Sequence, residues 1–315
     1  MGFNDEKVMY SFASGKKALV SMESNLLKRY DMHIHSTASD GTLDVPELVE
    51  LARLSNVGTM AITDHDTITG SRELLTNRPD DLEVYSGVEM SVLVKHGVER
   101  IHILGYDFDI NNPELNKALE LANKWSIYNF KLYLKFLREE YKDIDIPEAE
   151  FDRILALSKN ISRNDIAVLL EKYGYARDHQ DAFSRYLNPI KYAVQENKKG
   201  FTAQKVISLL KNAGGIVSLA HPSSLHLGDE ELDQRIAQYV DYGLDSIEVY
   251  HPKNKNQQRR YYLELAKKYG LLVSGGTDYH GLEIKPTTLM GSGINNNIDL
   301  RDNDLSLIKT LRKRH

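Results

Sequence analysis

Short apolar segments alternate with amphipathic helical patterns along most of the chain, and this alternation restricts the fold more than any other feature. Several of the apolar segments are nearly continuous runs, which is typical of strands buried on both faces. The alternation predicts an α/β protein built on a parallel sheet. The predicted strands span residues 29–35, 58–65, 83–90, 100–106, 214–221, 244–251 and 271–278.

The clearest helix signal lies between the first two predicted strands. Asp44 is a suitable N-cap residue, Glu47 stands three positions later to complete a capping box, and Pro46 lies in the first turn. Gly58 follows the last apolar position, and glycine is common just past a helix end. We therefore expect a helix that begins after Asp44 and ends before Gly58.

One long block consists of helical patterns without strands. It covers residues 113–199, and the strand–helix alternation resumes after it. For that reason we predict a helical insertion, although a separate domain is the alternative. The predicted organisation is an N-terminal extension (1–28), a first α/β part (29–112), the insertion (113–199), a second α/β part (200–285) and a C-terminal tail (286–315).

Composition excludes several classes of protein. The 315 residues carry a net charge of −5, which argues against a general nucleic-acid binder but leaves a local basic groove open. Because the sequence has no cysteine, it has no disulfide or thiolate metal site. The sequence shows no signal peptide and no apolar run long enough to span a membrane. We expect a cytoplasmic protein without a membrane partner, and its oligomeric state is left open.

Histidines and carboxylates stand where the apolar strands end. In a closed parallel barrel these ends converge on one face, which holds the active site. We therefore expect the side chains to meet, together with that of Asp40. His102 is an exception, because it lies inside its predicted strand. The residues at strand ends are His33, His35, His65, Glu89, His221, His251, Asp278 and His280.

The spacing of His33 and His35 matches the strand period of two. Both imidazoles then point to the same side and are able to bind one cation. Asp278 and His280 repeat this spacing, and the two oxygens of Glu89 are able to bridge two metals. Such a donor set suits zinc, manganese or iron better than magnesium. We expect two or three divalent ions, which in such centres activate water and hold a phosphoester.

The polar residues at the strand ends lie within seven motifs: "DMHIHSTASDGTLDVPELVELA", "AITDHDTITG", "GVEM", "HILGY", "LAHP", "IEVYHP" and "GLLVSGGTDYHG". Together these motifs resemble the polymerase-and-histidinol-phosphatase (PHP) family of metal-dependent phosphoesterases. The resemblance covers residues 30–106 and 202–281, and it implies a distorted (β/α)7 barrel, similar to a TIM barrel, with the helical block inserted as a cap.

The family pattern of nine metal ligands is complete in this sequence. The resemblance implies one metal held by His33, His35, Glu89 and Asp278, a second held by Glu89, His102 and His221, and a third held by Asp40, His65 and His280. A degraded, non-catalytic member would be expected to lack some of these residues.

The insertion is similar to the cap of a stand-alone branch of the family. That branch includes phosphatases of AMP or of 3′,5′-bisphosphonucleotides and RNase AM 5′–3′ exoribonucleases. In it, the arginine at the position of Arg163 contacts substrate phosphate, whereas the alternative here is a surface arginine at a helix start. The chain departs from the branch at Asp165, where histidine is usual, and at "YLNPIKY" (186–192). An acidic residue at position 165 would repel phosphate unless it is paired.

Other residues near the motifs have two readings each. His251 either contacts substrate phosphate or is a structural residue outside the metal ligands. Asp64 and Asp66 flank His65, and we interpret them as groups that orient the ligands or cap a helix. Trp125 is interpreted as a helix-packing residue rather than a platform for base stacking.

The predicted function is hydrolysis of a phosphate monoester by a hydroxide that bridges two metals. The expected substrate is a small phosphorylated molecule, most simply a nucleotide such as AMP or a 3′,5′-bisphosphonucleotide. The alternatives are a 5′–3′ exoribonuclease on short RNA and a non-catalytic metal-dependent binding domain. The expected catalytic residues are Arg163, His221 and His280, and the expected substrate-binding residues are Arg163 and His251.

Overall fold

The predicted alternation of strands and helices is confirmed by a computed structural model. It describes residues 7–11, 15, 17–21, 29–93, 101–157, 160–301 and 305–315. The strands of the α/β part are β3 (Arg29–Ile34), β4 (Val57–Ile62), β5 (Glu83–Val84), β6 (Gly87–Val92), β7 (Ile101–Tyr106), β8 (Ile216–Leu219), β9 (Ser246–Tyr250) and β10 (Leu272–Gly275). The accompanying helices are α1 (Val45–Leu54), α2 (Thr69–Thr76), α8 (Ala203–Asn212), a 3₁₀ turn η2 (Pro222–Leu225), α9 (Asp229–Tyr242), α10 (Asn256–Tyr269) and α11 (Ser306–Arg312).

Helix α1 begins as its sequence predicts. The backbone N–H of Glu47 donates to Asp44 Oδ1 (2.9 Å), and the backbone N–H of Asp44 donates to Glu47 Oε2 (2.9 Å). The helix ends at Leu54, before Gly58 as expected, but Gly58 does not terminate it, because this glycine already belongs to β4. Asn56 makes the turn instead, with a φ of 55°, a conformation that asparagine tolerates better than most residues.

The prediction of an all-parallel sheet is wrong at one strand. β7 pairs antiparallel with both β6 and β8, whereas β8, β9 and β10 are mutually parallel. A second sheet contains β3, β4 and β5 in parallel order. Strand β7 follows β6 after a short connection, and such a connection favours an antiparallel pair, since a parallel neighbour needs a crossover.

The two sheets approach each other at two points. An isolated bridge joins Ile34 of β3 to Tyr279, which follows β10, and another joins His65, which follows β4, to Glu89 of β6. Strands β3 to β10 form two separate sheets rather than one continuous barrel. The structure therefore confirms a mixed α/β fold, whereas the closed (β/α)7 barrel stays a prediction.

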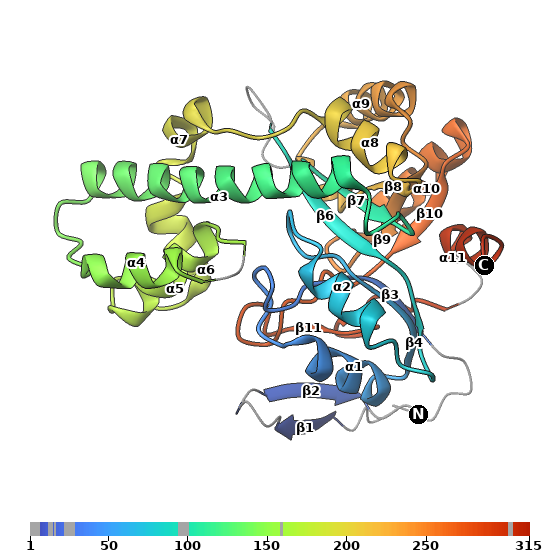
Figure 1. The fold of residues 1–315 in the computed structure, drawn as a ribbon, viewed down its shortest axis with the longest axis horizontal. Helices are drawn as coiled ribbons and strands as arrows, with labels where there is room; N and C mark the ends of the chain where they lie inside the picture. The colour runs from blue at the N-terminus through green and yellow to red at the C-terminus, as the bar shows by residue number, and fades with distance from the viewer. Residues whose placement is uncertain are drawn as a thin grey trace.

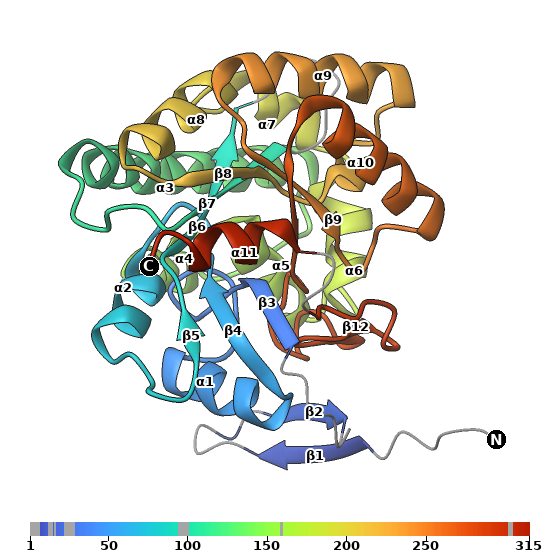
Figure 2. The same ribbon diagram turned by 90° about the vertical axis from the view of Figure 1, so that its right-hand side faces the viewer.

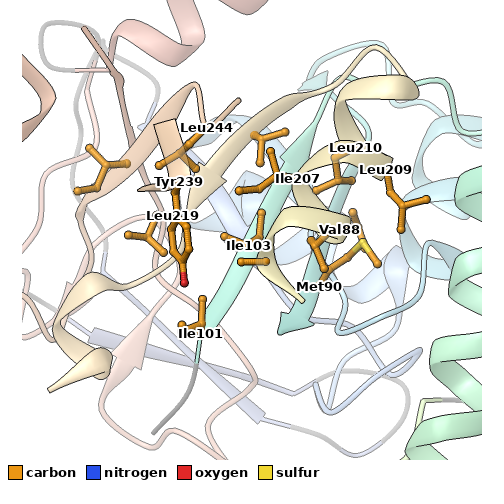
Figure 3. Close-up of a cluster of buried hydrophobic side chains, with 14 of the residues drawn as sticks. Val88, Met90, Ile101, Ile103, Ile207, Leu209, Leu210, Leu219, Tyr239 and Leu244 are labelled. Atoms are coloured by element: carbon orange, nitrogen blue, oxygen red, sulfur yellow. The ribbon is translucent and has the colours of Figure 1, made fainter. Parts of the chain in front are cut away.

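Helices cover the outer face of the larger sheet. Apolar residues of α8 and α9 pack against β6, β7 and β8, and Figure 3 shows Ile207 and Leu210 beside Ile103 and Val88. All four of these side chains are fully buried. This layer, seen beside the strands in Figure 2, fixes the strands whose ends carry the polar residues.

The segment predicted as a C-terminal tail packs into the core. It contains a short hairpin of β11 (Thr288–Leu289) and β12 (Gly293–Ile294) and then α11. Leu307, Ile308 and Leu311 of α11 are buried in one cluster with Met32 and Tyr106 from the two sheets. The tail thus joins the sheets at the side opposite to the insertion (Figure 1).

The helical block at 113–199 has a core of its own. It comprises α3 (Pro113–Glu140), α4 (Glu148–Leu155), α5 (Arg163–Lys172), α6 (His179–Ala182), a π-helical turn η1 (Phe183–Leu187) and α7 (Lys191–Asn197). The first half of α3 packs in the sheet cluster through Leu115 and Leu119, and its second half packs in the insertion cluster through Phe130 and Leu134. One long helix therefore ties the insertion to the sheets (Figure 1).

The predicted irregular N-terminal extension contains regular structure. β1 (Lys7–Ser11) and β2 (Lys17–Ser21) form an antiparallel pair. The rest of this extension lies outside the described residues, apart from residue 15. Among the helices that the structure describes, none combines the length and apolarity needed to cross a bilayer.

A buried carboxylate holds β3 to the C-terminal part of the chain, and we predict that it supports the fold. Asp31 is fully buried and accepts hydrogen bonds from the N–H (2.9 Å) and Oγ1 (2.6 Å) of Thr277 and from the N–H of Gly291 (2.8 Å). In Asp31→Asn the amide –NH₂ faces one of these donors, which loses its acceptor. The free energy of unfolding should fall by about 1–3 kcal/mol, measured by urea denaturation without metal.

Asp143→Asn is the matched control, because Asp143 is exposed. Its unfolding free energy should stay within about 0.5 kcal/mol of the original protein. Equal stability of Asp31→Asn and Asp143→Asn would contradict the assigned role of Asp31.

Candidate metal centre

The ligands predicted from the sequence gather at one rim of the two sheets. Most of them lie in or just after the ends of parallel strands, as expected. The antiparallel direction of β7 explains the apparent exception, His102. Because β7 runs opposite to its neighbours, its first residues lie at the rim where the other strands end.

Four donor atoms form a tight group at the centre of this rim. Nε2 of His33 lies 3.3 Å from Glu89 Oε2 and 3.5 Å from Asp278 Oδ1. Nε2 of His35 lies 3.2 Å and 3.3 Å from the same two oxygens. Metal–ligand bonds of about 2.0–2.1 Å in a tetrahedron place the donors about 3.3 Å apart, so the spacing fits one divalent cation.

Unsatisfied polar atoms in this group also indicate a cation site. His33 Nε2, His35 Nε2 and Glu89 Oε2 are buried without a hydrogen-bond partner in the structure. Buried polar atoms are nearly always paired, and electron pairs that face one another at 3.2–3.5 Å repel unless a proton or cation lies between them. The donor set therefore fits a metal ion in both geometry and chemistry.

A second group surrounds Asp40. Its Oδ1 lies 3.3 Å from His280 Nε2 and 3.5 Å from His35 Nδ1, and its Oδ2 lies 3.8 Å from His65 Nε2. The donor atoms of His35, Asp40, His65 and His280 all lie within 4.8 Å of one another. The predicted trio of Asp40, His65 and His280 is thus brought together, with His35 beside it.

The remaining predicted trio is Glu89, His102 and His221, and its two histidines face the other oxygen of Glu89. His102 Nδ1 and His221 Nε2 each lie 2.9 Å from Glu89 Oε1. His65 Nδ1 lies 3.0 Å from Oε2 of the same carboxylate and forms a compact group with Glu89 and His102. His65 therefore stands between two groups, whereas the resemblance assigned it to one.

Sequence reasoning missed Glu248, which orients two of the ligands. It is fully buried, its Oε1 lies 2.8 Å from His33 Nδ1, and its Oε2 accepts from the backbone N–H of His221 (2.6 Å). A proton on Nδ1 of His33 leaves Nε2 free for a metal, the usual arrangement behind a ligating histidine. The available signal was an acidic residue inside the apolar strand "SIEVY".

Asp64 holds the loop beside the ligands, and the orienting role predicted for it stays a prediction. Its carboxylate accepts hydrogen bonds from the N–H (2.8 Å) and Oγ (2.7 Å) of Ser36 and from Oγ of Ser39 (2.6 Å). These bonds fix the loop between His35 and Asp40.

The side chains of His251 and Lys285 both contact the carboxylate of Asp278. Nδ1 of His251 accepts from the N–H of Lys253 (3.2 Å), so the ring proton is on Nε2, which faces Asp278 Oδ2 at 3.4 Å. The ammonium group of Lys285, also missed from the sequence, donates to the same oxygen and to the carbonyl of Asp278. His251 is 1% exposed, which favours the structural reading over phosphate contact, a prediction that stays untested.

The backbone at two ligands adopts an uncommon conformation. His221 has a φ of 26° and Asp278 has a φ of 52°, values that non-glycine residues adopt at some cost in energy. Both residues lie just after parallel strands. The turn of the backbone redirects the side chains toward the rim.

Without a metal, electrostatics favour the ligand form of some groups but not of His35: burial lowers the pKa of His35, but the carboxylates of Asp278 and Glu89 beside its ring raise it to about 9. Burial lowers the pKa of His102 and of His280 to about 4, so both rings are neutral at pH 7, the form that binds metal. Burial opposes charge on Glu89, but His65, His102 and His33 hold the pKa of Glu89 well below its usual range.

Arg163 lies at the first position of α5, at the edge of the centre. Its guanidinium stacks 4.9 Å from the ring of Phe183, and its Nη1 lies 3.5 Å from the hydroxyl of Tyr133. Asp165 does not face the rim, because its Oδ2 accepts from the N–H of Ser162 (2.7 Å) in a capping box. The acidic replacement in this chain is therefore paired as a helix cap.

A cleft of about 220 Å³ lies between the metal centre and the insertion. Asp40, His65 and His102 line its inner end, and Arg163, Lys191, Lys198 and Lys199 line its walls. Trp125 also lines it, 4.7 Å from the ring of Phe201, so its interpretation as a packing residue is incomplete. The cleft places basic and aromatic groups beside the candidate ligands.

Comparisons with known proteins agree with this geometry. Residues 31–206 match the PHP domain family. The 5′–3′ exoribonuclease Rnm of Escherichia coli K12 is 31% identical over 268 residues, which cover 82% of this chain and 87% of the relative. The 3′,5′-nucleoside bisphosphate phosphatase of Chromobacterium violaceum is 26% identical over 262 residues, which cover 79% and 86%.

A solved structure of a phosphoesterase is also similar to this chain. A protein assigned as a metal-dependent phosphoesterase from Bifidobacterium adolescentis superposes with a TM-score of 0.71 at 27% identity, covering 91% of this chain and 95% of that chain. These likenesses confirm the predictions of a PHP-type fold and of a phosphoric ester hydrolase. The chain belongs to the PHP domain family.

Proposed function

We propose that the chain is a metal-dependent phosphatase that releases phosphate from a nucleotide, such as AMP or a 3′,5′-bisphosphonucleotide. One observation carries the proposal: buried, unpartnered donor atoms of His33, His35 and Glu89 converge at metal-ligand spacing beside a basic cleft. The phosphatase relative from Chromobacterium violaceum supports the substrate class.

We assign the metal ions to the three groups around Glu89 and Asp40. The donors suit manganese, iron or zinc, and two or three ions would be held by the nine residues that the sequence predicts. Such ions, when bound, act as Lewis acids and activate water for attack on phosphorus. We also propose that the two sheets act as one distorted seven-stranded barrel that holds these residues.

The residues of this chain then divide the remaining tasks. Glu248 and Asp64 orient the ligands, and Asp278 receives support from His251 and Lys285. Arg163 is assigned to bind phosphoryl oxygens through the N–H donors of its planar guanidinium group. Its positive charge would offset the negative charge of the phosphate. Lys191, Lys198 and Lys199 make the cleft attractive to anions.

A 5′–3′ exoribonuclease activity is the second candidate. The relative from Escherichia coli favours it, and so do Trp125 and the lysines of the cleft, since aromatic and basic groups together suit single-stranded nucleic acid. A non-catalytic binding domain is disfavoured, because all nine predicted ligand positions are retained. A cytoplasmic location stays a prediction.

We predict phosphate release from AMP or a 3′,5′-bisphosphonucleotide by the Mn²⁺-loaded protein, and none after treatment with a chelator. A colorimetric phosphate assay checks this, with 5′-phosphorylated short RNA as a parallel substrate resolved on a gel. Shortening of the RNA without mononucleotide turnover would favour the exoribonuclease. Mn²⁺ binding without hydrolysis of any substrate would favour the binding domain.

His33→Ala should remove turnover and weaken Mn²⁺ binding by more than about 100-fold, because it deletes a ligand and leaves Glu248 without its partner. Equilibrium dialysis with elemental analysis measures the metal, and circular dichroism checks the fold. His226→Ala is the matched control, since His226 is exposed outside the donor groups. Unchanged metal content in His33→Ala would refute the ligand assignment.

Arg163→Ala should lower kcat/KM by about 10- to 100-fold, which corresponds to the loss of a charge-assisted hydrogen bond to phosphate. Steady-state kinetics measure the effect, and Mn²⁺ content should not change. Arg153→Ala is the control, because Arg153 is exposed on the neighbouring helix α4. Equal kcat/KM for the two variants would show that Arg163 is a surface residue at a helix start.

A further inference from the structure

The helical insertion touches the metal centre at the start of α5. The side-chain amide of Asn164 donates to Asp40 Oδ2. Just before the helix, the side-chain amide of Asn160 donates to the carbonyl of His65 (2.6 Å), and its backbone N–H donates to the carbonyl of Ala38 (3.1 Å). Three hydrogen bonds thus join the insertion to the loops that carry two of the candidate ligands.

The two oxygens of Asp40 face different partners. Oδ1 faces His280 Nε2 and His35 Nδ1 at 3.3 and 3.5 Å, and it is buried without a hydrogen-bond partner in the structure. Oδ2 receives the amide of Asn164. The amide therefore holds one oxygen and leaves the other directed at the imidazoles.

The first turn of α5 determines where Asn164 points. Ser162 and Asp165 form a capping box. The side chain of Ser162 accepts a hydrogen bond from the backbone N–H of Asp165, and the side chain of Asp165 accepts one from the backbone N–H of Ser162. With Asp165 turned back to the cap, its neighbours Arg163 and Asn164 face outward, Arg163 into the cleft and Asn164 onto Asp40. Asp165 thus helps to direct Asn164 toward Asp40, because it forms the helix cap.

We propose that Asn164 is a positioning residue that the insertion contributes to the metal group around Asp40, and that a divalent cation there and the docking of α5 stabilise each other. The inference rests on the metal centre proposed above. Such coupling is reciprocal: if docking of α5 strengthens cation binding, cation binding strengthens docking by the same factor. Arg163, the neighbour of Asn164, would then be held over the centre when the cation is bound.

The first test measures Mn²⁺ binding to the full chain by isothermal titration calorimetry and elemental analysis. Asn164→Ala should weaken one class of site by about 10- to 100-fold, as expected for loss of a group that orients a ligand, and leave the others unchanged. Asn188→Ala, an exposed asparagine of the same insertion, should bind as the original protein does.

A double-mutant cycle separates positioning from a general structural effect. In an Asp40→Ala background, Asn164→Ala should cause no further loss of Mn²⁺ affinity, because the carboxylate on which it acts is gone. An additional loss of the full 10- to 100-fold would overturn the proposal, since Asn164 would then act through something other than Asp40.

The second test measures hydrogen exchange of the original protein with and without Mn²⁺, and Asn164→Ala serves as the comparison. Mn²⁺ should slow amide exchange in residues 160–172, and this change should disappear in Asn164→Ala. Identical exchange with and without Mn²⁺, in a protein shown to bind the metal, would overturn the coupling alone. Failure of the original protein to bind Mn²⁺ would instead overturn the proposed metal centre.

Discussion

The buried carboxylate of Glu89 imposes the strongest constraint on the structure. It has no exposed surface, and nitrogens of five histidines lie 2.9–3.3 Å from its two oxygens: His33, His35, His65, His102 and His221. A buried charge costs several kcal/mol unless opposite charge or hydrogen bonds offset it. Burial opposes charge on His35, but the carboxylates of Asp278 and Glu89 beside its ring raise the pKa of this imidazole to about 9. A proton or a divalent cation between the donors is therefore able to offset the buried charge of Glu89.

The sheets meet this constraint by bringing strand ends together. Parallel strands deliver His33, His221 and Asp278 at one rim, and the antiparallel β7 delivers His102 from its opposite end. A carboxylate inside another strand, Glu248, then orients two of these residues. Ligands and orienting groups thus sit in strands or close after them, where the regular elements restrict side-chain motion more than a long loop would.

The insertion contributes to the candidate metal centre in two ways. Its cleft wall provides positive charge for an anionic substrate, and the start of α5 reaches Asp40 through Asn164. Because α3 packs in both apolar clusters, the insertion is anchored to the sheets along one helix. Substrate recognition and metal retention would therefore depend on the same contact between the two parts.

Part of the fold and of the metal centre could be predicted from the sequence, because it depends on local chemistry. The strand period pairs His33 with His35, the capping box starts α1 at Asp44, and strand ends carry polar groups that an apolar core does not need. The family motifs supplied the ligand set, including His102, whose placement inside a strand had no local explanation. These features depend on neighbours within a few residues, so a sequence displays them directly.

Tertiary structure alone decided the rest. The pairing of β7 with β8, the partners of Glu248 and the approach of Asn164 to Asp40 all join residues far apart in the chain, over 124 positions in the last case. No local pattern encodes such pairs, because they arise when packed layers bring distant segments into contact. The sequence by itself determined which donors exist and on which elements they lie. The packing of the sheets and the insertion determined which donors meet and which groups hold them in place.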